Sequence, residues 1–172
     1  MLRRVLKLMV SFVLVFGVLQ GYAGSIEKLK KDRDMLLERM TEVLDLVRNE
    51  NQKLKEVKTL DQYRAVMDGV LDLLAEKDFL TLAVERVDKI IFGLNVLAGV
   101  GVSEKDLIIR RYGPVTGFFV VAAEGALDVV KELDKEYYTV ETRRLAREVT
   151  KDLEEFLDLY SLDRFLPKGK KK

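Results

Sequence analysis

The sequence predicts an all-α protein, an elongated antiparallel helical bundle built from long, coiled-coil-like helices. Apolar residues recur every three or four positions over three long stretches, as in helices that bury one face. Capping residues or glycines lie between these stretches. The most β-favouring segment, residues 118–121, has no evident partner strand elsewhere, and a lone strand is not stable.

Composition excludes several kinds of chemistry. The 172 residues include no cysteine and no histidine, so the chain lacks thiolates, disulfides, the commonest general base and the commonest nitrogen ligand of metals. Thirty Lys and Arg residues nearly balance 29 Asp and Glu residues, which gives no reason to expect a nucleic acid as partner. We therefore expect a non-enzymatic protein without a catalytic, cofactor or metal site.

The first 23 residues have the layout of a secretory signal peptide. Three basic residues precede an uncharged stretch, residues 8–19, and Gly21 and Ala23 lie just before a candidate cleavage point. That stretch is short for a membrane span, which needs about 20 apolar residues. We expect cleavage after Ala23 and export to the periplasm or the exterior, with an uncleaved membrane anchor as the alternative.

The first long helix is expected over residues 26–57. Ten positions from Ile26 to Val57 follow a three-four spacing and form a seam, a row of residues on one helix face, and eight of the ten are apolar. At 1.5 Å per residue this helix would be about 48 Å long. Leu37 and Leu44 widen the seam, which favours a bundle over a strict two-helix coiled coil.

The second helix is expected over residues 60–98. Thr59 followed by Gln62 has the form of a capping box, and nine of ten seam positions from Val66 to Ala98 are apolar. The short turn between the two helices predicts that they are antiparallel neighbours. Beyond Phe79 apolar residues occupy several faces, which predicts more than one helical partner or contact with lipid.

The rest of the sequence predicts a short helix over residues 103–111 and a third long helix over residues 115–162. The seam of the third helix slips after Val140, which indicates a kink or a new cap near residues 139–142 and hence a break near 140.

Without a long linker or an internal repeat, residues 24–166 are expected to form a single helical bundle domain. Residues 167–172 are expected to be a basic, disordered tail.

Two uncharged apolar runs, Ile90–Val102 and Tyr112–Ala123, occupy the middle of the chain, and six of the eleven glycines lie between residues 90 and 127. One interpretation is that the runs are the inner ends of two closely packed helices, since small residues let backbones approach. The other is that residues 90–127 form an apolar hairpin that enters a membrane or a hydrophobic partner. Core packing is the favoured interpretation.

Four residues are candidates for interaction with a partner. Arg110 and Arg111 beside Tyr112 offer two guanidinium groups and an aromatic ring to a phosphate, a carboxylate or an anionic head group. Glu124, like Asn95, lies within or beside an apolar run, and a buried carboxylate there would need a donor such as Arg110. The alternative for all of these residues is an ordinary position at the solvated surface.

These observations favour an exported, non-enzymatic structural or interaction protein that binds a protein partner or a second copy of itself. Membrane association, through an uncleaved N-terminal helix or the apolar hairpin, is the alternative. A third hypothesis is a carrier of a small ligand within the bundle, because a cavity between helices leaves no sequence motif.

Overall fold

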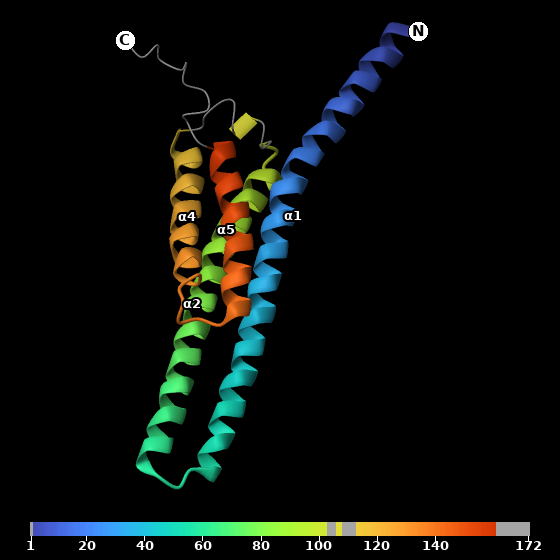
Figure 1. Ribbon diagram of the computed structural model, residues 1–172. Helices are drawn as coiled ribbons and strands as arrows, with labels where there is room; N and C mark the ends of the chain where they lie inside the picture. Colours follow the sequence, from blue (N-terminus) through green and yellow to red (C-terminus); the bar gives the residue numbers. More distant parts are fainter. Residues whose placement is uncertain (1, 103–105, 108–112, 161–172) are drawn as a thin grey trace, which may run out of the picture.

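The fold is all-α, as the sequence predicts. This computed structural model describes the backbone of residues 2–102, 106–107 and 113–160, and the side chains of residues 24–102, 106–107 and 114–160. Within these ranges no strand occurs, and residues 118–121 are helical. The helices are α1 (Leu2–Lys53), the 3-10 turn η1 (Leu54–Glu56), α2 (Leu60–Gly99), α4 (Gly113–Glu132) and α5 (Val140–Tyr160) (Figure 1).

The long helices alternate in direction, so that each is antiparallel to the helix that precedes it (Figure 1). α1 packs against α2, α2 against α4, and α4 against α5, and α5 closes the ring on α1. At one end α1 and α2 extend together beyond the α4–α5 turn as a two-helix arm. At the other end, where α2 ends and α4 begins, the N-terminal part of α1 projects past the bundle.

The core follows the predicted seams. Leu36 and Val43 of α1 and Leu80 and Val87 of α2 are completely buried. Burying one such side chain contributes about 1.5 to 3 kcal/mol relative to leaving it in water. The second half of the chain completes the core with one face of α4 and one of α5: Phe119, Ala123, Ala126, Val130, Ala146, Val149, Leu153 and Phe156.

Both ends of α2 form as the sequence predicts. Gln62 N–H donates to Thr59 Oγ1 and Thr59 N–H donates to Gln62 Oε1, each at 3.2 Å, so the capping box is complete. At the other end Gly101 has a φ of 77°, a left-handed conformation that glycine adopts at little cost. The turn brings Val102 N–H within 3.0 Å of the Leu97 carbonyl oxygen, which satisfies one of the last carbonyls of the helix.

Two helix boundaries differ from the prediction. α1 runs without a break from Leu2 and ends at Lys53, with the 3-10 turn following it, instead of covering residues 26–57. The break expected near residue 140 is a full reversal of the chain over residues 133–139, so that α4 and α5 are antiparallel partners. Burial of Leu133 and Tyr138 fixes this loop to the core, although the loop contains neither glycine nor proline.

Two predicted segments fall mainly outside the described residues. Of the short helix expected over residues 103–111, the structure describes only Asp106 and Leu107, and Leu107 is buried. The basic tail, residues 167–172, lies beyond the last described residue, Tyr160.

The α2–α4 contact depends on the absence of a side chain at Gly93. A Cβ atom at this position would lie 2.9 Å from Phe119 Cε1 and 3.2 Å from Phe118 Cε1. Because the Phe119 side chain is only 1% exposed and packed on all sides, it has little room to move away. Gly93 therefore lets two aromatic rings of α4 rest directly on the backbone of α2.

We predict that Gly93→Ala lowers the free energy of unfolding by about 1 to 3 kcal/mol, because overpacking outweighs the gain in helix propensity of about 1 kcal/mol. Gly69→Ala is the matched control in the same helix, since nothing lies within 4 Å of a Cβ atom there. The control should raise the free energy of unfolding by up to about 1 kcal/mol. Urea unfolding of both variants checks the prediction, and equal effects at the two positions would contradict it.

Candidate functional site

Among the residues predicted to interact with a partner, the structure describes one. Glu124 is exposed on α4, and Asn95, the other polar residue of the apolar runs, is exposed on α2. Arg110, Arg111 and Tyr112 lie outside the described residues.

The two apolar runs are each divided into a buried side and an exposed side. Ile90 and Leu94 of α2 and Ala123 of α4 are completely buried, in agreement with the core-packing interpretation. The opposite side is exposed over the same stretch of both helices. We call these exposed side chains the apolar face: Phe92, Val96, Val100, Phe118 and Val121.

The apolar face leaves a substantial area of apolar side chain exposed. Phe92 and Phe118 line one shallow hollow, together with the charged side chains of Glu85, Asp88 and Lys89. The other members follow at intervals of three or four residues, in opposite directions from the hollow because α2 and α4 are antiparallel. The five side chains are 49% to 72% exposed. With about 150 to 200 Å² for a fully exposed side chain, they leave roughly 500 Å² of apolar surface uncovered. A patch of this size is at the upper end for monomeric proteins and is often functional.

Among the residues whose side chains the structure describes, no helix is long and apolar enough to cross a membrane.

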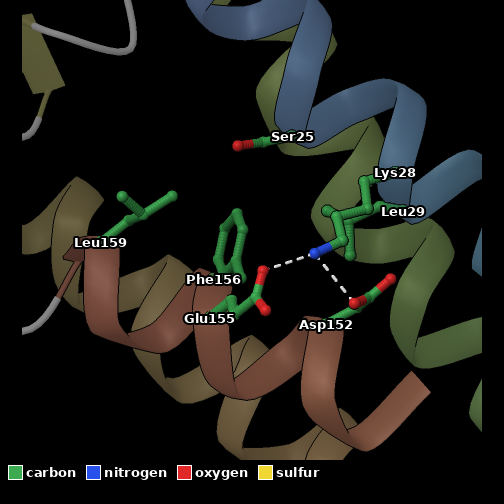
Figure 2. A pocket seen from close by; sticks show the side chains of 7 residues that line it. All are labelled: Ser25, Lys28, Leu29, Asp152, Glu155, Phe156 and Leu159. Carbon is green, nitrogen blue, oxygen red and sulfur yellow. Dashed lines mark hydrogen bonds and ion pairs between the residues drawn. The ribbon is translucent and has the colours of Figure 1, made fainter. Parts of the chain in front are cut away.

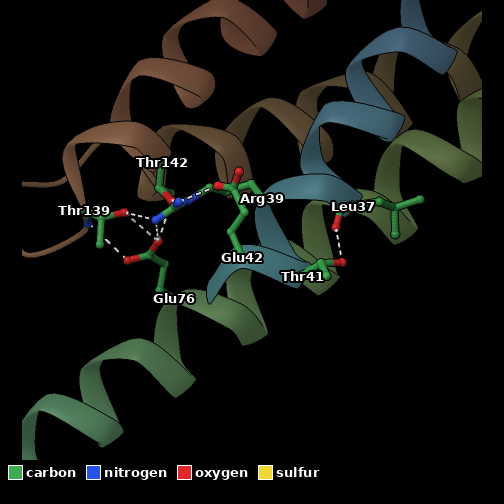
Figure 3. Close-up of polar contacts among 7 residues, drawn as sticks. All are labelled: Leu37, Arg39, Thr41, Glu42, Glu76, Thr139 and Thr142. Carbon is green, nitrogen blue, oxygen red and sulfur yellow. Dashed lines mark hydrogen bonds and ion pairs between the residues drawn. The ribbon is translucent and has the colours of Figure 1, made fainter. Parts of the chain in front are cut away.

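A buried ionic network joins α1, α2 and the start of α5 (Figure 3). Arg39 Nε donates to Thr142 Oγ1 and Arg39 Nη2 donates to Thr139 Oγ1, both at 2.7 Å. Both threonine hydroxyls donate to Glu76 Oε1, at 2.8 Å for Thr139. The Thr139 N–H donates to Glu76 Oε2 at 3.1 Å, so the carboxylate also occupies the N-terminal end of α5.

The charges in this network are almost completely enclosed. The Glu76 side chain is 2% exposed and the Arg39 side chain 9% exposed, and their charged groups lie 3.4 Å apart. Arg39 also pairs with Glu42 at 2.7 Å, at the protein surface. Since every group has a partner of opposite charge or a hydrogen bond, the network can hold three helices in register without an unpaired buried charge.

We predict that Arg39→Met lowers the free energy of unfolding by about 3 kcal/mol or more, because Glu76 then remains buried without its cation. Arg48→Met is the control: Arg48 also pairs with a carboxylate in α1, but its side chain is 73% exposed. The control should cost less than about 1 kcal/mol. The additional change Glu76→Gln should restore part of the lost stability. Urea unfolding measures the free energy of unfolding of each variant. Similar losses for Arg39→Met and Arg48→Met would refute the prediction.

A second group of charges lies between α1 and α5. Lys28 Nζ lies between two carboxylates of α5, 2.8 Å from Asp152 and 2.6 Å from Glu155 (Figure 2). One turn along, Lys31 pairs with Glu148 at 3.0 Å. Hydrogen bonds to these carboxylates raise the pKa of both lysines. The pairs with Glu155 and Glu148 are largely exposed and contribute little stability, whereas Asp152 is only 11% exposed. Together the pairs favour one alignment of α5 on α1.

Asp32 differs from the other charged residues of this region because it is completely buried. Neither of its carboxylate oxygens accepts a hydrogen bond in the part of the chain that the structure describes. Burial, together with the nearby carboxylate of Asp152, raises the pKa of Asp32 to about 7. The protonated form is neutral and can donate to Asp152, so it suits this position better than the ion.

This pKa makes stability depend on pH. The folded state retains the Asp32 proton between pH 3.8 and about 7, where the unfolded state has lost it, so stability falls as pH rises through this window. We predict that Asp32→Asn raises the free energy of unfolding at pH 8 by up to roughly 4 kcal/mol and changes it little at pH 4. Thermal unfolding at both pH values measures the effect. The exposed Asp72→Asn should show no such difference, and equal effects of Asp32→Asn at both pH values would count against the prediction.

Sequence reasoning missed Asp32, Arg39 and Glu76. Their spacing carries a signal, since Asp32 and Arg39 alternate with Leu29, Leu36 and Val43 at three-four intervals, and Glu76 lies between Leu73 and Leu80. Charged residues in a helix normally lie at the solvated surface, however, so this spacing alone does not predict burial. The pair Thr139 and Thr142 indicates a new helix cap but does not identify Glu76 as its partner.

Comparison of the chain with family models, with curated proteins and with solved structures finds no match. Function must therefore be argued from the residues. The Arg39–Glu76 network and Asp32 lie between helices and determine how the bundle packs. The apolar face is different, because the described part of the chain leaves these side chains exposed.

Proposed function

We propose that this chain is an exported, non-enzymatic interaction protein and that the apolar face is its docking surface. The observation that carries the proposal is the exposure of Phe92 and Val121, at 72% and 68%, above a core that is already closed. Apolar side chains gathered in this way are stabilised when a partner removes them from water, at about 25 cal/mol per Å².

Export is supported by the N-terminal sequence and is compatible with the packing of the bundle. The signal-like pattern ends at Ala23, and the buried residues described in α1 begin at Ile26. Cleavage after Ala23 would therefore remove none of the described core of the bundle.

A non-enzymatic role is supported by the chemistry of the buried polar residues. The chain has no histidine and no cysteine. Glu76 is fully engaged with Arg39 and two threonines, and Asp32 is enclosed between α1 and α5. These carboxylates stabilise or destabilise packing rather than present a reactive group to a substrate.

Association with a membrane is the second candidate, and the path of α1 favours it. α1 continues as one helix from the apolar N-terminal segment into the bundle. It leaves the bundle at the end where α2 ends and α4 begins, the same end that carries the apolar face (Figure 1). If the segment is retained in a bilayer, the apolar face lies near the membrane surface.

Photo-crosslinking in the producing cell tests the proposal. A photoreactive side chain replaces Val121 in the full chain, and Lys151, whose side chain is 76% exposed on α5, is the control position. We expect the chain in the exported fraction, with protein adducts formed from position 121 and few from position 151.

Each outcome of this experiment has a meaning. Protein adducts from position 121 support the docking surface, whereas lipid adducts alone favour the membrane candidate. Retention of the chain in the cytoplasm, or equal labelling from positions 121 and 151, would overturn the proposal.

A further inference from the structure

We infer that the contact between α1 and α5 is a latch that opens when Asp32 loses its proton. Residues 149–160 of α5 then separate from α1, while the beginning of α5 stays in place. This latch is separate from the apolar face and from the partner proposed for that face. Three features of the described residues support it: the surroundings of Asp32, the difference between the two ends of the α1–α5 contact, and the sparseness of that contact.

The cations beside Asp32 are directed at other carboxylates. Lys28 and Lys31 flank Asp32 in α1, and each pairs with carboxylates of α5, as Figure 2 shows for Lys28. These carboxylates are Glu148, Asp152 and Glu155. α2 faces this part of α1 with Asp88, which pairs with Arg33 at 3.5 Å. Asp32 is completely buried, and within the described part of the chain neither of its oxygens accepts a hydrogen bond.

The carboxylate of Asp152 opposes the ionised form of Asp32. Its side chain is only 11% exposed, so water screens the repulsion between the two groups poorly. With a proton on Asp32, the two carboxyl groups can share a hydrogen bond across the α1–α5 contact. Without the proton two negative charges meet there, and separation of the helices relieves them because it returns Asp32 to water. The proton therefore holds the contact closed.

The two ends of the α1–α5 contact differ in how their charges are compensated. Near the beginning of α5, Arg39 of α1 binds Thr142, and both bind Glu76 (Figure 3). Ionisation of Asp32, about two turns away from Arg39 in α1, adds no charge to this network. The beginning of α5 is thus anchored, and the opening is expected at the other end, where Asp32 meets Asp152.

The contact of α5 with α1 is the sparsest of the four between neighbouring long helices. No short loop joins these two helices, so they can separate in part while the α1–α2 and α2–α4 hairpins stay intact. Regions with few contacts open locally at a lower cost in free energy than the whole domain. An uncompensated charge at this place therefore acts first on the α1–α5 contact.

The direction of the pH dependence follows from the pKa of Asp32 in the two forms. In the closed form burial raises the pKa to about 7, whereas in the open form water surrounds the carboxyl group and the ordinary value of 3.8 applies. Between these values the closed form keeps a proton that the open form releases, so opening becomes about tenfold more favourable for each pH unit. Above about pH 7 both forms are ionised and the opening constant no longer changes.

Thiol trapping tests the latch, because the chain has no cysteine of its own. Leu153→Cys places a thiol in the part of α5 that opens, and Ala146→Cys places one near the anchored beginning; both positions are completely buried. Lys151→Cys, at a side chain that is 76% exposed, gives the reactivity of a free thiol at each pH. The reaction with a pyridyl disulfide is timed at pH 5 and pH 8 on the full chain, with the N-terminus that it carries in the cell.

Relative to Lys151→Cys, the rate for Leu153→Cys should rise about a hundredfold from pH 5 to pH 8, and the rate for Ala146→Cys less than about threefold. Any loss of stability caused by a cysteine substitution itself is the same at both pH values and cancels in this comparison.

Variants of Asp32 show whether this residue is the cause. In the Leu153→Cys chain, Asp32→Asn removes the charge and should give equal relative rates at both pH values. Asp32→Leu, with an apolar side chain of similar volume, should do the same and is the second variant if the amide is poorly accommodated. The exposed Asp72→Asn should leave the hundredfold change intact.

Three results would overturn the latch. These are a relative rate for Leu153→Cys that does not change with pH, a change that persists in both Asp32 variants, or an equal change for Ala146→Cys. The last result would mean that ionisation of Asp32 opens the whole bundle at once instead of one end of α5.

Discussion

Arg39 and Glu76 carry opposite charges into the interior at the point where α1, α2 and the start of α5 meet. An ion in a protein interior costs several kcal/mol unless a partner and hydrogen bonds compensate it. Sliding any of the three helices by one turn would separate these groups and leave a charge uncovered. The network therefore fixes the register of the bundle, which apolar burial alone fixes poorly because it has no direction.

The contacts between helices divide into two kinds. Helices that follow one another in the chain pair mainly through apolar side chains, such as Leu36 with the α2 seam and Phe119 on Gly93. The α1–α5 contact joins residues more than 100 positions apart, and it is here that Lys28, Lys31 and Asp32 face carboxylates of α5. Charged and hydrogen-bonded groups thus fix the alignment of α5 on α1, two helices that no short loop connects.

Much of the fold follows from the sequence, and the site follows less well. Periodicity predicts the burial of Val43 and Leu80, and Thr59 with Gln62 marks the start of α2, because both signals are local. The pairing of Arg39 with Glu76 is not local, and the reversal before Val140 lacks the usual glycine or proline. The apolar runs are evident in the sequence, but which of their side chains remain exposed depends on how four helices close into a ring. Arg110, Arg111 and Tyr112 stay predictions.

The alternating order of the helices also bears on how the chain folds. α1 with α2, α2 with α4, and α4 with α5 are hairpins that form between neighbouring segments, and such local topology is typical of domains that fold in microseconds to milliseconds. The closure of α5 onto α1, together with the bonds from Glu76 to Thr139 and Thr142, joins distant parts of the chain. Its entropic cost grows slowly with the length of the intervening loop, by about 0.6 kcal/mol per doubling. A newly made chain can thus assemble most of its core hairpin by hairpin before its two ends meet.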